Sequence, residues 1–152
     1  MALHNRIDSR ILKEKIRSTK EKRTTISFYK YHHLDAPGIF RDQLYLDLAS
    51  LDVLGRIYVS KEGINAQVSV PSDKVEDFRS RLYAIDFLNG VRLNLAVEDN
   101  GKSFFKLKIL VRKKIVADGL NDDSFDVTDC GVHVSARECN RLAEDLNTII
   151  VD

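Results

Sequence analysis

The sequence has no apolar run approaching the roughly 20 residues needed to cross a membrane, and its first residues lack the basic-then-apolar pattern of a signal peptide. It has only two cysteines, Cys130 and Cys139, too few for a disulfide framework and too far apart for a CxxC motif. These absences argue against a membrane protein and a disulfide-stapled scaffold. We therefore expect a cytoplasmic protein in a reducing compartment, with no membrane partner.

Recognisable metal and cofactor motifs are also missing. The four histidines lack Cys or acidic neighbours at the spacing of a metal site, and no flavin, haem or iron motif is visible. These histidines are His4, His32, His33 and His133. We expect no metal and no cofactor, and mostly surface or structural roles for these side chains. For His32 and His33, contact with a phosphate or a base is the functional alternative.

Hydrophobic periodicity predicts the order of elements in this 152-residue chain, which is long enough to bury one core. Alternating apolar residues predict strands over 24–33, 56–60, 64–70 and 91–97, and one more over 105–111 beyond an Asn100-Gly101 turn. Two helices are expected, one from Pro37 to a terminating Gly55 and one after Pro71. Their apolar stripes are Phe40, Leu44, Leu48 and Leu51, and Val75, Phe78, Leu82 and Ile85.

The order strand, helix, strand, strand, helix, strand is that of the split βαβ, ferredoxin-like unit. We predict an α+β ferredoxin-like sandwich with an extra strand over residues 23–117. A basic helical arm over 1–22 precedes it, with its helix at 6–20, and an acidic linker over 118–134 follows.

Residues 135–152 do not fit this domain. Ser135 and Glu138 form a capping box ahead of a helix, and 148–151 has the composition of a buried strand. One helix and one short strand cannot make a core. We therefore expect 135–152 to be the start of a second, truncated domain.

Two faces of the predicted sheet differ in composition. Residues predicted to face the helices are Ile57, Val59, Ile64, Ala66, Val68, Val70, Leu93 and Leu95. The opposite face would display Tyr29, Tyr31, Arg56, Tyr58, Asn65, Gln67, Ser69, Arg92 and Asn94. Tyrosine and amide side chains of this kind stack on bases or dock a second domain.

Charge is unevenly distributed, although the net charge is only +1. Residues 1–30 carry nine Lys or Arg, and 102–114 carry six without an acid, including Lys102, Arg112 and Lys113. Such segments attract polyanions such as RNA, and the alternative is an ordinary solvated surface. We therefore group Lys102, Arg112 and Lys113 with the sheet face and His32 as candidates for RNA or domain binding.

The segment Lys61-Glu62-Gly63 is expected to be the turn between the second and third strands. Lys61 and Glu62 could act as general acid and base, with Asn65 polarising a carbonyl. Charged residues at hairpin tips are ordinary, however, and binding through Lys61 and Asn65 is the favoured function. Acylphosphatases share this element order, but residues 31–38 contain no glycine-rich phosphate cradle, so we do not expect acyl phosphate hydrolysis.

Four blocks of sequence carry a family resemblance: LHNRI at 3–7, RTTISFYKYHHL at 23–34, GRIYVSKEGINAQVSVP at 55–71 and GKSFFKLKILVRKKIVADG at 101–119. Together they resemble the amino-terminal, acylphosphatase-like domain of the bacterial rhodanese-domain TrhO (YceA) family of tRNA uridine hydroxylases. The segment SARECNRLAEDLNTIIVD is similar to the start of the rhodanese domain in that family.

The resemblance implies oxygen-dependent 5-hydroxylation of the wobble uridine 34 of tRNA by the parent enzyme. It also implies tRNA and the family's own C-terminal rhodanese domain as partners. The family's catalytic cysteine lies in a rhodanese loop that would follow Asp152, and neither Cys130 nor Cys139 matches it. No catalytic residue is therefore assigned, and the isolated chain is expected to be inactive. A structural docking or dimerisation module without RNA contact is the alternative.

Overall fold

A computed structural model of the chain describes residues 7–96, 102–116 and 126–151. Its strands are β1 Arg23–Tyr31, β2 Leu54–Ser60, β3 Gly63–Pro71, β4 Asn94–Leu95 and β5 Leu107–Val111. Its α-helices are α1 Ser9–Ser18, α2 Pro37–Ser50, α3 Val75–Tyr83 and α4 Ala136–Ala143, and two 3-10 turns are η1 Ser72–Lys74 and η2 Asp86–Leu88. None of the helices in the described ranges is long and apolar enough to span a bilayer.

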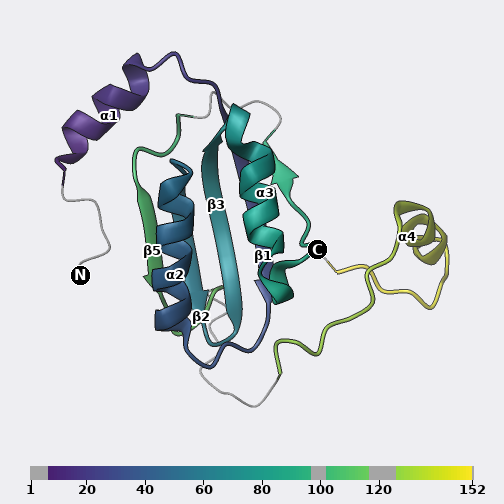
Figure 1. Cartoon of the computed structure of the whole chain (residues 1–152). Helices are drawn as coiled ribbons and strands as arrows, with labels where there is room; N and C mark the ends of the chain where they lie inside the picture. Colours follow the sequence, from purple (N-terminus) through teal and green to yellow (C-terminus); the bar gives the residue numbers. More distant parts are fainter. Residues whose placement is uncertain (1–6, 97–101, 117–125, 152) are drawn as a thin grey trace.

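The five strands form one sheet in the order β4-β1-β3-β2-β5. The pairs β4–β1, β1–β3 and β3–β2 are antiparallel, and β5 pairs parallel to β2. The first four strands in this arrangement are those of the ferredoxin-like fold, which confirms the predicted fold class. Figure 1 shows α2 and α3 lying together over one face of the sheet.

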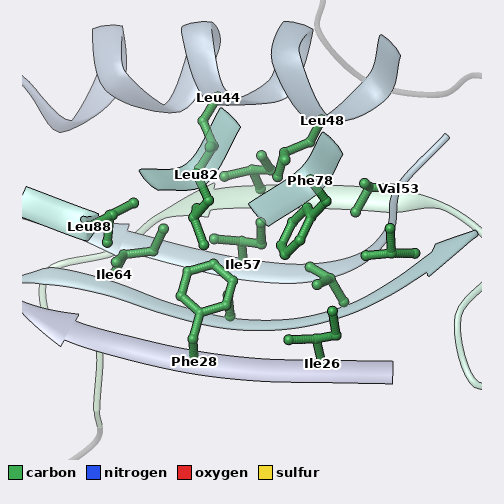
Figure 2. Packing of buried hydrophobic residues seen from close by; sticks show 14 of the residues in the cluster. Ile26, Phe28, Leu44, Leu48, Val53, Ile57, Ile64, Phe78, Leu82 and Leu88 are labelled. Atoms are coloured by element: carbon green, nitrogen blue, oxygen red, sulfur yellow. The ribbon is translucent and has the colours of Figure 1, made fainter. Parts of the chain in front are cut away.

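The core lies between these two helices and the sheet. Leu44 and Leu48 of α2 and Phe78 and Leu82 of α3 are buried against β1, β2 and β3 (Figure 2). The Phe78 ring is tilted against the Phe28 ring of β1, with their centroids 6.3 Å apart. Both predicted helical stripes are therefore confirmed, since their remaining members are buried or packed against this core.

The predicted inward face of the sheet is confirmed for β2 and β3. Ile57 and Val59 of β2 and the four apolar alternate residues of β3 are buried in the core, and Leu93 packs against it. Leu95 pairs with the buried Ile26 and so lies on the predicted side of the sheet, but it is not buried: the residue is 57% exposed. Leu95 lies on a two-residue strand at the edge of the sheet, with a neighbouring strand on one side only. The fourth strand is thus shorter than the predicted 91–97, and Val97 lies outside the described residues.

The end of α2 differs from its prediction. The helix ends at Ser50, and Asp52 takes the left-handed backbone conformation with φ 56°, so Gly55 is not the helix terminator. Gly55 lies inside β2, where a Cβ atom would be 2.4 Å from the Gln67 carbonyl oxygen of β3. The glycine is therefore needed for close approach of two strands rather than for a helix cap.

The C-terminal part contains a capped helix but no strand. Ser135 Oγ accepts a hydrogen bond from the Glu138 N–H at 3.3 Å at the start of α4, which confirms the serine half of the predicted capping box. The Glu138 carboxylate accepts hydrogen bonds from Arg141 at 3.0 and 2.6 Å. Residues 148–151 form no strand, and Ile149 and Val151 are 86% and 87% exposed. A strand needs a hydrogen-bonding neighbour, and none pairs with this segment in the part of the chain that the structure describes.

The N-terminal helix prediction is confirmed by α1, which begins at Ser9. Leu12 is buried, and Lys102 Nζ donates to the Arg17 and Thr19 carbonyl oxygens at 3.0 and 3.1 Å, satisfying the helix C-terminus. His4, the Asn100-Gly101 turn and residues 118–125 of the predicted linker lie outside the described residues, and 126–134 contain no helix or strand.

Arg23 is a buried cation at the start of β1. Its Nε donates to Ser69 Oγ at 3.0 Å, its Nη2 donates to the Ser69 and Asp52 carbonyl oxygens at 2.8 and 2.6 Å, and Nη1 pairs with Glu21. Arg23 therefore joins the α1–β1 connection, β3 and the turn after α2.

Replacing Arg23 by methionine should lower the free energy of unfolding by about 2–4 kcal/mol, because two backbone carbonyl oxygens and the buried Ser69 lose their donors. The matched control is Lys22→Met, which removes the adjacent exposed cation and should change stability by less than about 0.5 kcal/mol. Urea unfolding followed by circular dichroism measures both. Equal losses in the two variants would contradict a structural role for Arg23.

Gly63 begins β3 in the hairpin, with φ +136°, and a Cβ atom there would be 2.0 Å from the Lys30 carbonyl oxygen. Gly63→Ala should therefore destabilise the domain by at least about 1–3 kcal/mol, since the backbone of β1 or β3 must move. Gly38→Ala is the control: Gly38 lies in α2 with nothing within 4 Å of a Cβ, and alanine there should stabilise by up to about 1 kcal/mol. Thermal unfolding should give midpoint shifts of opposite sign.

Candidate binding face

The candidate site is the sheet face opposite α2 and α3, called here the polar sheet face. The strand register arranges its side chains in rows. One row contains Asn94, Ser27, Gln67, Arg56 and Lys108, contributed by β4, β1, β3, β2 and β5 in that order. The next row contains Tyr29, Asn65, Tyr58 and Leu110. The sequence prediction that tyrosine, amide and arginine side chains gather on one face is thus confirmed for the three central strands and for Asn94 of β4.

The tyrosines form an aromatic group with a cation. Tyr29 is 56% exposed, and its ring meets the ring of Tyr31 edge to face at a centroid distance of 6.3 Å. On the other side of Asn65, the Arg112 guanidinium lies 5.5 Å from the centroid of the Tyr58 ring. A guanidinium over an aromatic ring is held by the ring's negative face and still presents N–H donors to a ligand.

Arg56 and Lys108 are neighbours on the paired strands β2 and β5, and both are exposed. Across the described residues, neither has a carboxylate within ion-pair distance. Two adjacent like charges on a sheet repel each other, so an approaching anion lowers the electrostatic free energy of the pair.

The hairpin turn at 61–63 is not an open catalytic loop, because the segment after β5 is hydrogen-bonded to it. Glu62 accepts a hydrogen bond from the Ile115 N–H at 3.3 Å, and Asn65 Nδ2 lies 3.5 Å from the Ile115 carbonyl oxygen. Ile115 itself is buried. Asn65 and Glu62 therefore hold the segment after β5 against the polar sheet face, and Lys61 remains exposed at the turn.

Two predicted residues, His32 and Lys102, make contacts away from the polar sheet face. His32 stacks on Phe87 at 4.5 Å with the rings 7° from parallel, and Phe87 packs against the helix-covered core. Lys102 binds the carbonyl oxygens at the end of α1. Arg92 is exposed but precedes the short β4. Lys113 is exposed just beyond β5, near Arg112.

Sequence reasoning missed one contact, between His33 and Asp126, and one candidate residue, Lys108. His33 Nε2 lies 2.9 Å from Asp126 Oδ1. This contact joins the chain just after β1 to a residue 93 positions further along. Hydrogen bonds from Thr128, together with the His33 contact, hold the pKa of Asp126 below its usual value. Lys108 was also missed, although its place between the inward-facing Leu107 and Ile109 is a signal for an outward-facing cation.

No chemistry of its own is evident at this face. Cys130 and Cys139 are free and exposed, and neither belongs to the sheet. Within residues 7–96, 102–116 and 126–151, no three His, Cys, Asp or Glu side chains cluster to hold a metal ion. The arrangement can bind an anionic or aromatic partner, with cations on one row and tyrosines on the next.

Comparison with known proteins agrees with this fold. Proteins called tRNA uridine(34) hydroxylase from Escherichia coli O17:K52:H18 (strain UMN026 / ExPEC) and from Salmonella typhi are each 50% identical to the chain over 151 residues. A third from Escherichia coli O1:K1 / APEC is 49% identical. Each alignment covers 99% of the chain but only 43% of the relative, so the chain spans less than half the length of these proteins.

A family model described as the UPF0176 acylphosphatase like domain matches residues 23–115. The match begins with β1 and ends at the buried Ile115 beyond β5, so it coincides with the five-stranded sheet and its two helices. The chain therefore belongs to the UPF0176 family of acylphosphatase-like domains.

Proposed function

We propose that this chain is the RNA-engaging amino-terminal domain of a tRNA hydroxylase, which binds tRNA through the polar sheet face. For the whole protein the proposed reaction is the oxygen-dependent conversion of uridine 34 to 5-hydroxyuridine. The identity with tRNA uridine(34) hydroxylases over nearly the whole chain supports this reaction class. We assign no catalytic residue to this chain and place the chemical step in a rhodanese domain of the whole protein.

The observation that carries the proposal is the pair Arg56 and Lys108, which has no ion-pair partner among the described residues, beside Arg112 on Tyr58. Phosphate contacts from Lys and Arg dominate the affinity of proteins for nucleic acids, and aromatic rings stack on unpaired bases. The two kinds of group lie on adjacent rows of one sheet, so a single bound strand could use both.

Helix α1 supplies a second basic element. Arg10, Lys13 and Arg17 follow one another at helical spacing and are exposed, opposite the side on which Leu12 is buried. Lys13 Nζ lies 5.1 Å from the Phe105 ring centroid, and Lys106 Nζ lies 5.6 Å from the same ring, just ahead of β5. The α1 cations therefore adjoin those of β5 and extend the positive surface.

The exposed apolar residues near the C-terminus favour a second function for that segment. Val132, Leu146, Ile149, Ile150 and Val151 are all exposed in the described structure. Contiguous exposed apolar side chains mark interaction sites. In this alternative the chain is a docking module for its own rhodanese domain, and the polar sheet face contacts protein instead of RNA.

A tRNA titration distinguishes these functions. Arg56→Gln and Lys108→Gln together should weaken tRNA binding by the chain and reduce the slope of log affinity against log salt by about 2, because about two phosphate contacts are lost. Fluorescence anisotropy at two or more salt concentrations measures both quantities.

The matched control is Arg79→Gln on α3, which removes a cation from the helix-covered side and should leave the salt slope unchanged. An unchanged affinity for the double variant, or a loss shared equally by the control, would contradict RNA binding through the polar sheet face. The docking alternative predicts that the double variant keeps its affinity for tRNA.

A further inference from the structure

A hollow of about 340 Å³ opens on the polar sheet face beside β4. The residues that line it include Gln67 and Asn94, which carry amide groups, the hydroxyl residue Ser27, and Leu95 and Phe104. Its volume lies near the lower end of the range for small-molecule sites, which suits one compact planar group rather than a protein segment.

The lining has the chemistry of a nucleobase site. A carboxamide carries donors and an acceptor on one planar group, as the edges of bases do, and amide side chains pair with bases for this reason. Phe104 in the lining provides an aromatic residue that can contact the face of a base. No charged side chain of the described residues lines the hollow, so it favours a neutral base over a phosphate.

Cations lie next to the hollow along the same row. Ser27 and Gln67 in its wall are followed across the sheet by Arg56 and then Lys108. Neighbouring strands are about 4.8 Å apart, so the first cation is one strand from Gln67 and the second is two strands away. A nucleotide with its base in the hollow could therefore place its backbone phosphates near these two cations.

We propose that this hollow binds one unstacked base of single-stranded RNA, with the adjoining phosphates on Arg56 and Lys108. This inference rests on the proposed function, because it assumes RNA on the polar sheet face, and it adds the form of the ligand. Unpaired bases can leave the stack and enter such a site, whereas bases in a duplex cannot without unpairing.

The test compares a short fluorescent oligouridylate with an abasic oligomer of the same length and charge. The chain should bind the oligouridylate about tenfold more tightly, since stacking and amide contacts act on the base alone. Gln67→Ala and Phe104→Ala should each reduce this preference several-fold while leaving the affinity for the abasic oligomer unchanged. Gln43→Ala on α2 is the matched control and should keep the full preference.

The outcomes separate this proposal from the previous one. Equal, salt-dependent binding of both oligomers, or tRNA binding without oligomer binding, overturns the base site and leaves the proposed function standing. If the chain binds neither of the oligomers nor tRNA, both the base site and the proposed function are overturned. If Phe104→Ala proves unfolded by circular dichroism, Gln67→Ala decides the result. The side-chain amide NMR signals of Gln67 and Asn94 should also shift with oligouridylate and not with the abasic oligomer.

Discussion

The two-residue alternation of β1, β2 and β3 is the constraint on which both faces of this domain depend. The apolar residues at alternate positions of these strands enter the core under α2 and α3, as Ile26, Ile57 and Ala66 do. The residues between them must then face the other way. A slip of one residue would bring Gln67 and Arg56 into the core, so burial on one face fixes the composition of the other.

The strand order explains how the chain covers part of its own polar face. Strands β4 and β5 lie at opposite edges of the sheet, and α2 and α3 cover the other face (Figure 1). Ser103 and Phe104 accordingly share a hollow with Ser27 and Gln67. The segment after β5 then packs against Glu62 and Asn65. Among the described residues of this face, the cationic pair, Tyr29, Gln67 and Asn94 are exposed.

Much of the fold could be predicted because its central strands and helices follow regular periods. The buried stripes of α2 and α3 and the inward residues of β2 and β3 could be recognised from spacing alone. Prediction was less successful where a residue's environment depends on distant chain. Leu95 has the alternation of an inward residue but lies at an edge, and residues 148–151 have strand composition without a partner strand. Local pattern contains no information about such neighbours.

The sequence by itself determined which side chains of the central strands share a face, because the pleat alternates strictly and apolar residues must leave water. It also determined the family, through conspicuous blocks such as the one containing the hairpin. Only the tertiary structure decided which polar residues on that face stay accessible. On that face Asn65 is engaged by Ile115, whereas Arg56 and Lys108 are neighbours without a carboxylate partner among the described residues. Away from that face, Lys102 is engaged by α1 and His32 by Phe87. These outcomes depend on contacts between segments that are far apart in the chain and that only the tertiary fold brings together.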